Sequence, residues 1–192
     1  MMETIAFQVL PPVPNWSELH PLVIHFPIAL LLVAPLFVIG GVILAPPKGR
    51  PFLIAALALM VMGTAGTFLA IATGEAAGEV ADRTAVMSGV LEHHEDLAET
   101  TRIIFSVLTL IFAAILFLPR LLKRELTTAV ARTLPVAFLL LYGAGTIVLV
   151  NTAHNGGRLV HELGIHAGLA QTTGTESSPA SIGRTAEKAE KE

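Results

Sequence analysis

The sequence predicts an all-α membrane protein: a polytopic bundle of four helices that cross the bilayer. Two observations predict this fold class, the apolar composition and the presence of four long apolar segments. Hydrophobic residues make up 53% of the 192 residues and charged residues only 14%. The mean hydropathy of +0.70 is too high for a soluble domain of this length. The predicted spans are residues 21–45, 51–72, 103–118 and 134–153.

The first span is the most continuous apolar segment. From Pro21 to Ala45 the only ionisable side chain is His25. This length exceeds the roughly 20 apolar residues that a helix needs to cross a bilayer. The chain is therefore expected to enter the membrane here, with His20 and His25 at the point where it does so.

Small residues form a stripe along the second span. Gly63, Gly66, Ala70 and Gly74 recur at helical spacing, which lets another helix or a flat ligand approach closely. The polar residues at 73–75 are expected to end this helix.

The third helix is predicted to begin near Thr84 and to continue through the span at 103–118. On this helix His94 falls near the centre of the apolar stripe and His93 at its edge. The acidic residues fall on the far side: Glu92, Glu95, Asp96 and Glu99. We expect His94 to face the bundle and the acids to face water.

The fourth span is predicted to end at a helix-stop signal. Asn155, Gly156 and Gly157 follow the span and are typical of a helix C-terminus. Within the helix Gly143 and His154 share one face.

The remaining segments are expected to be two tails and a short interfacial helix around a single membrane domain. Residues 1–18 form a Pro-rich tail without the basic region of a cleavable signal peptide, and residues 19–168 form the membrane domain. Residues 158–166 are expected to form a short interfacial helix, and residues 169–192, rich in Thr, Ser, Gly, Ala and Glu, a mobile tail. No internal repeat stands out.

Basic residues predict the orientation of the spans. The connections at 46–50 and 119–133 hold six Lys or Arg residues, whereas residues 74–102 hold two among seven acids. The positive-inside rule then places both basic connections in the cytoplasm and both termini outside. In a bacterial cytoplasmic (inner) membrane, outside means the periplasmic side.

With this orientation all seven histidines fall on the outer side of the membrane. They begin the first span, precede the third and follow the fourth: His20, His25, His93, His94, His154, His161 and His166. An ionisable group at the membrane boundary is costly without a partner, which makes each a functional candidate. This one-sided distribution is the strongest functional signal in the sequence.

The cluster suits a haem b held by two neutral imidazoles from different helices. Because the chain has no cysteine, covalently attached haem c, iron–sulfur clusters and thiolate metal sites are excluded within it. His25 lies about 7.5 Å deeper than His20 at ~1.5 Å per helical residue, so we expect His25 to be the better-buried ligand, with His94 or His154 opposite. His20 is the further candidate. Only one haem layer is expected, since the inner side has no histidine.

The same residues leave two alternatives open. A Zn, Cu or Fe ion could bind His25, His94 and His154, with Glu75 or Glu95 as a carboxylate ligand. Alternatively, the histidines form a hydrogen-bonded, pH-titrating polar cap in a structural or assembly subunit that has no cofactor. Spacing alone does not separate these hypotheses.

Four motifs are distinctive. They are His-Pro-Leu-Val-Ile-His-Phe-Pro-Ile-Ala-Leu at 20–30, Thr-Gly-Glu-Ala-Ala at 73–77, Glu-His-His-Glu-Asp-Leu-Ala at 92–98 and Gly-Gly-Arg-Leu-Val-His-Glu at 156–162. Together they resemble a family of four-span prokaryotic membrane proteins that is classed as a domain of unknown function. In that family the domain occurs alone or fused to Rieske or cytochrome c domains, so the resemblance implies a link to electron transfer.

The sequence favours an electron-transfer or accessory subunit over a stand-alone enzyme. It has no Gly-rich phosphate loop and no nucleophile motif, and it has no basic surface for nucleic acid. The expected partners are the lipid bilayer, cytochrome c, Rieske or other respiratory subunits, and a second copy of the chain.

Overall fold

The computed structural model describes residues 14–44, 47–81 and 85–165, and within them the chain is helical without strands. The elements are η1 (Trp16–Glu18), α1 (His20–Val23), α2 (His25–Leu44), α3 (Arg50–Glu79), α4 (Ala85–Leu121) and α5 (Thr128–His161). Four helical segments are long and apolar enough to cross a membrane: His20–Leu44, Arg50–Glu79, Val86–Leu121 and Thr128–His161. The predicted four-span all-α fold is confirmed. Residues 1–13 of the tail expected at 1–18, the whole tail expected at 169–192, and His166 lie outside the described residues.

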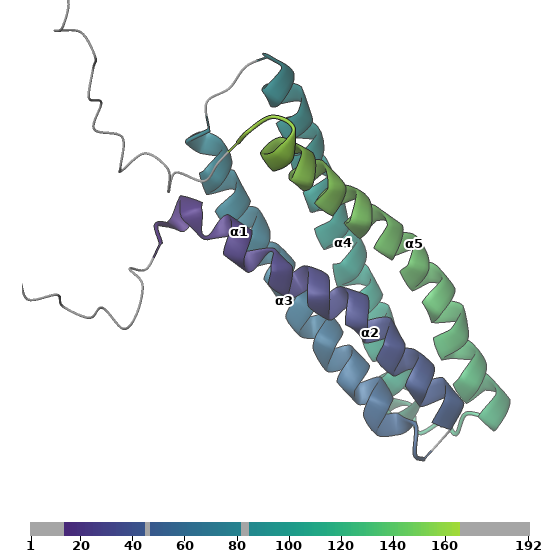
Figure 1. Ribbon diagram of the computed structural model, residues 1–192. Coiled ribbons are helices and arrows are strands. Elements are labelled where there is room, and N and C mark those ends of the chain that lie inside the picture. The colour runs from purple at the N-terminus through teal and green to yellow at the C-terminus, as the bar shows by residue number, and fades with distance from the viewer. Residues whose placement is uncertain (1–13, 45–46, 82–84, 166–192) are drawn as a thin grey trace, which may run out of the picture.

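The four long helices form an up-and-down bundle (Figure 1). Each packs against two neighbours, α2 on α3, α3 on α4, α4 on α5 and α5 on α2, while the backbones of the diagonal pairs do not come close within the described residues. The core lies in the body of the bundle and is rich in aromatic and aliphatic side chains: Leu31, Val38, Met60, Phe105, Phe112, Phe138 and Tyr142. The outward faces are apolar and exposed, as expected for helices that contact lipid.

Prolines interrupt the first span. Proline has no N–H for the carbonyl four residues earlier, and the helix breaks at Ile24, three residues before Pro27. Farther along, Pro35 leaves the carbonyl of Leu31 without its helical donor. The buried hydroxyl of Tyr142 on α5 donates to that carbonyl at 2.7 Å, so a bond between helices replaces the missing bond within one.

Two helices extend beyond their predicted ends. α3 continues through residues 73–75 to Glu79, and α5 continues through Gly156 and Gly157 to His161. These stop signals fail because the residues in question pack against neighbouring helices: Thr73 and Asn155 are buried, and Gly74 and Gly156 each contact a histidine ring. Residues 158–161, expected in a separate interfacial helix, are the last turn of α5.

The bundle consists of two equivalent helical hairpins, a repeat that the sequence analysis did not find. Buried positions recur at the same spacing in α2 and α4, and again in α3 and α5. The matching pairs are Leu31 with Phe105, Ala34 with Leu108, Val38 with Phe112, Ala56 with Phe138, Met60 with Tyr142 and Gly63 with Gly145. Few of the paired residues are identical, which is why only the burial pattern reveals the repeat. In the same register His20 matches His94, and Gly74 matches Gly156.

Candidate functional site

The candidate site lies at the end of the bundle where α1 begins and α3 and α5 end, the upper end in Figure 1. Of the six histidines within the described residues, His20 and His94 turn inward here and are partly buried. They come from the first helix of each hairpin, and each ring packs on the second helix of its own hairpin.

His20 lies against the last turns of α3. Its Nδ1 is 2.9 Å from the carbonyl oxygen of Ala70 and 3.2 Å from the hydroxyl of Thr73. The ring lies over Gly74, where an added Cβ would be only 2.9 Å from the Cε1 atom of His20. A side chain at Gly74 would therefore displace the imidazole.

His94 lies against α5 in the same manner. Its Nδ1 is 3.0 Å from the carbonyl oxygen of Thr152. A Cβ added at Gly156 would lie 3.0 Å from the Cε1 atom of this ring. In both hairpins, the carbonyl that contacts the ring comes four residues before the glycine beneath it. We refer to each such histidine, carbonyl and glycine as a half-site.

The hydrogen bonds determine the tautomer of both rings. A carbonyl oxygen only accepts, so each Nδ1 must be the protonated nitrogen and donate to it. In a neutral imidazole the Nε2 atom then keeps its lone pair. Neither Nε2 has a hydrogen-bond partner in the described part of the chain. Both half-sites thus present an available nitrogen ligand.

The two half-sites face the same end of the molecule. α1 contacts η1, α2 and α3, but no backbone contact joins it to α4 or α5 among the described residues. α1 therefore makes no backbone contact with the second hairpin, whereas deeper in the bundle α2 packs on α5.

His25 does not lie where the sequence analysis expected. It is exposed, and its Nδ1 donates to the carbonyl of Pro21 at 2.6 Å on its own segment. Five residues along a helix correspond to a rotation of about 140°. Because His20 faces α3, His25 faces away, and its greater depth along the axis does not bury it.

The remaining histidines lie outside the pair. His154 is exposed, and Gly143, which was expected to share its face, has no atom within 4 Å of an added Cβ. That face points out of the bundle. His93 and His161 are also exposed.

The acidic side chains do not join the histidines. Glu75 and Glu95 are exposed, and the described residues contain no group of three His, Asp or Glu side chains able to hold a metal ion. Glu92 and Asp96 face outward too, as expected. Glu99 instead pairs with Arg102, whose guanidinium lies 5.0 Å from the ring centre of Phe68 on α3.

The sequence did not reveal several residues that position the His20 and His94 rings. Ala70 and Thr152 supply the carbonyl acceptors. The hydroxyl of Thr152 lies 2.8 Å from that of Thr101, which joins α4 to α5 beside His94. Two carbonyls are within reach of its single proton, that of Val148 at 2.9 Å on the same helix and that of Leu97 at 3.1 Å on α4. One sequence pattern could have pointed to these acceptors. In both hairpins a glycine follows a small residue by four positions, Ala70 to Gly74 and Thr152 to Gly156, on the helix that comes after the histidine.

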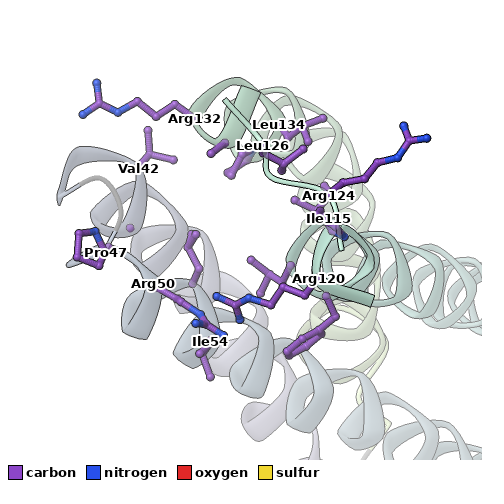
Figure 2. Close-up of a pocket in the computed structure, with 18 residues that line it drawn as sticks. Val42, Pro47, Arg50, Ile54, Ile115, Arg120, Arg124, Leu126, Arg132 and Leu134 are labelled. Atoms are coloured by element: carbon purple, nitrogen blue, oxygen red, sulfur yellow. The ribbon is translucent and has the colours of Figure 1, made fainter. Parts of the chain in front are cut away.

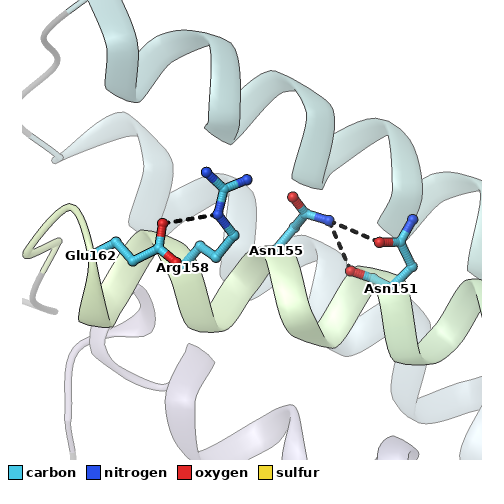
Figure 3. Close-up of polar contacts among 4 residues, drawn as sticks. All are labelled: Asn151, Asn155, Arg158 and Glu162. Atoms are coloured by element: carbon cyan, nitrogen blue, oxygen red, sulfur yellow. Dashed lines mark hydrogen bonds and ion pairs between the residues drawn. The ribbon is translucent and has the colours of Figure 1, made fainter.

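The end of α5 has its own polar contacts (Figure 3). The buried Asn155 donates to the carbonyl and to the side-chain oxygen of Asn151, at 2.9 and 3.2 Å. Arg158 pairs with Glu162 at 2.9 Å on the exposed side. These contacts help to explain why α5 continues past Asn155, a residue that otherwise favours helix ends.

Comparison with known proteins gives one match. The model of the family described as "Predicted membrane protein (DUF2231)" matches residues 17–168, and the chain belongs to this family. The matched segment contains both half-sites and all four long helices. No curated protein and no solved structure matches the chain.

Proposed function

We propose that this member of the DUF2231 family is a haem b-binding subunit of a membrane electron-transfer system, with His20 and His94 as the axial ligands. The proposal rests on one observation: two equivalent half-sites each present an imidazole whose Nδ1 is fixed by a backbone carbonyl and whose Nε2 is free. Of the four histidines that the sequence suggested as haem ligands, these are the two that the fold turns inward.

The chemistry of the pair suits haem better than a bare metal ion. A porphyrin supplies four nitrogen ligands, so the protein needs to add only two. Zn, Cu or non-haem Fe takes three or four protein ligands, and no third His, Asp or Glu joins the pair among the described residues. A hydrogen bond from the second nitrogen of a ligating histidine to a carbonyl is the usual way to fix ring orientation.

The repeat supports the same proposal. A haem with two identical axial ligands is symmetric about its iron, and two half-sites in equivalent registers of two hairpins match that symmetry. The glycines beneath the rings let each imidazole lie against a helix backbone, where the carbonyls of Ala70 and Thr152 fix its orientation. When bound, haem supplies one-electron redox chemistry, while His20 and His94 hold it and fix its position.

The distribution of charge suggests the side and the partners. Six Lys and Arg residues lie at the end opposite the histidines: Lys48, Arg50, Arg120, Lys123, Arg124 and Arg132. By the positive-inside rule the half-sites then lie on the periplasmic side of a bacterial cytoplasmic membrane. A single haem near that surface suits electron exchange with a cytochrome c, a Rieske protein or another respiratory subunit.

A spectrum of the purified protein tests the proposal. The protein is expressed with haem synthesis intact, purified in detergent, and measured as a reduced-minus-oxidised difference spectrum. We expect a Soret and an α band from about one haem b per chain, as two axial imidazoles give. His20→Ala and His94→Ala should each abolish the bands, while His25→Ala and His154→Ala should retain them.

Controls separate loss of the ligand from loss of the fold. Each variant is checked for helical content and for a single peak in size-exclusion chromatography. A folded His20→Ala or His94→Ala variant with full haem content would overturn the assignment of ligands. A wild-type spectrum without haem bands would overturn the function, and elemental analysis of that sample would show whether Zn, Cu or Fe is bound instead.

A further inference from the structure

A cavity lies at the opposite end of the bundle from the histidines (Figure 2). It has a volume of about 340 Å³ and extends between the ends of α2, α3, α4 and α5. Apolar side chains such as Leu53, Ile115 and Leu134 line it. Four arginines line it as well: Arg50, Arg120, Arg124 and Arg132. A volume near 300 Å³ is at the lower limit for sites that hold a small organic ligand.

The arginines of this cavity lack a counter-charge. The ion pairs in the described part of the chain, Arg102 with Glu99 and Arg158 with Glu162, lie toward the other end of the molecule. No carboxylate lines the cavity. In Figure 2 Arg50 and Arg120 extend into the space between their helices, whereas Arg124 and Arg132 point away from it. Like charges that converge without an acid favour a bound anion.

We propose that this cavity binds the phosphate headgroup of an anionic phospholipid. The cavity lies where the membrane-spanning segments end, which is the level of lipid phosphates. Its mixed lining matches such a lipid, because guanidinium groups bind phosphate through paired hydrogen bonds and the apolar walls suit the glycerol backbone and the first part of an acyl chain. Basic pockets between membrane helices recognise acidic headgroups in this way.

This site is independent of the proposed function. It lies at the other end of the bundle and shares no residue with either half-site. We assign Arg50 and Arg120 as the phosphate-binding residues, because these two point into the cavity. All four arginines are exposed, and Arg124 and Arg132 lie at the rim of the cavity.

Lipid retention tests the proposal. The full chain is reconstituted into nanodiscs of equal parts phosphatidylglycerol and phosphatidylcholine, released, and analysed by native mass spectrometry for bound lipid. We expect the wild type to retain phosphatidylglycerol, and the double variant Arg50→Gln/Arg120→Gln to lower the retained ratio of phosphatidylglycerol to phosphatidylcholine about tenfold, since both charge-assisted contacts are lost.

A matched variant distinguishes the cavity from general surface charge. Lys48→Gln/Lys123→Gln removes the same charge at the same end of the bundle without touching the cavity lining, and it should retain the lipid preference. An equal loss in both double variants would overturn the proposal. Saturable binding of soluble glycerol 3-phosphate by the wild type, without lipid retention, would also overturn it and identify a site for free anions.

Discussion

The two half-sites use the same elements but are supported differently. His20 begins the short helix α1, just before the break at Ile24, and its Nδ1 also reaches the hydroxyl of Thr73. His94 lies within the unbroken α4 and has no hydroxyl partner of this kind in the described structure. The position equivalent to Thr73 is Asn155, which bonds to Asn151 instead.

The contacts that join the two helices of each hairpin below the ring, which we call its seam, differ as well. In the first hairpin an apolar contact joins the helices, with Pro27 packed on Gly66. In the second, Thr101 and Thr152 join them through their hydroxyls. The two half-sites share the histidine, the carbonyl and the glycine, so we expect these three features to matter most for the proposed ligand. Ring support from a hydroxyl and the polarity of the seam vary between them.

The glycines provide the strongest test of this comparison. Gly74→Val and Gly156→Val place atoms where the Cε1 of each ring now lies, within 3.0 Å of an added Cβ. The ring must move off its carbonyl, and haem affinity should fall about tenfold or more, the equivalent of roughly 1.4 kcal/mol. Haem titration of both variants measures this effect.

Gly157→Val is the matched control for this pair. Gly157 is next to Gly156 on α5, yet an added Cβ meets no atom within 4 Å. Gly157→Val introduces the same residue as Gly156→Val, with the same helix propensity, and it should leave haem affinity unchanged. Equal affinity in Gly156→Val and Gly157→Val would contradict the role of the glycine in the half-site.

The hairpins also differ in the core of the bundle, where Tyr142 in the second hairpin is equivalent to Met60 in the first. Its hydroxyl bonds the Leu31 carbonyl that Pro35 leaves without a helical donor, whereas the equivalent Met60 has no polar group. Tyr142→Phe should lower the free energy of unfolding by about 1–2 kcal/mol. Met60→Leu, which conserves volume, should cost less than about 1.5 kcal/mol. Denaturation in mixed micelles measures both, and an unchanged stability for Tyr142→Phe would show that the bond is not needed.

The threonine pair has the smallest expected effect. A double-mutant cycle of Thr101→Val and Thr152→Val isolates their interaction, which should contribute about 0.6 kcal/mol, as typical hydrogen bonds between membrane helices do. The same micelle denaturation gives the coupling energy. A coupling energy of zero would mean that the polar seam of the second hairpin is no stronger than the apolar seam of the first.

The spans were predictable from the sequence because hydropathy and length suffice to identify them. The inward direction of His94 was also predicted correctly, since a long continuous helix lets residue spacing be converted to direction. The ends of α3 and α5 were not predictable in this way. Gly74 and Gly156 favour a helix end locally, but tertiary contact with the histidine rings overrides that preference.

His20 and His25 show why the site itself was harder to predict. Depth along the helix suggested His25, but burial depends on rotation about the helix axis. The first span has apolar residues on every side, because it also contacts lipid. No polar face fixes its rotation in the sequence. The carbonyl partners were also hidden, because a backbone acceptor at Ala70 or Thr152 leaves no trace in residue identity.

Each half-site is made within a single hairpin, with α1 bonded to α3 and α4 to α5. During biosynthesis all residues of the first half-site are therefore synthesised before His94, and this half-site can form before the second, consistent with the tendency of chains to fold from the N-terminus. The second half is complete only once α5 has been translated. A ligand that bridges both rings can thus be inserted only into the finished chain, as the last step of maturation.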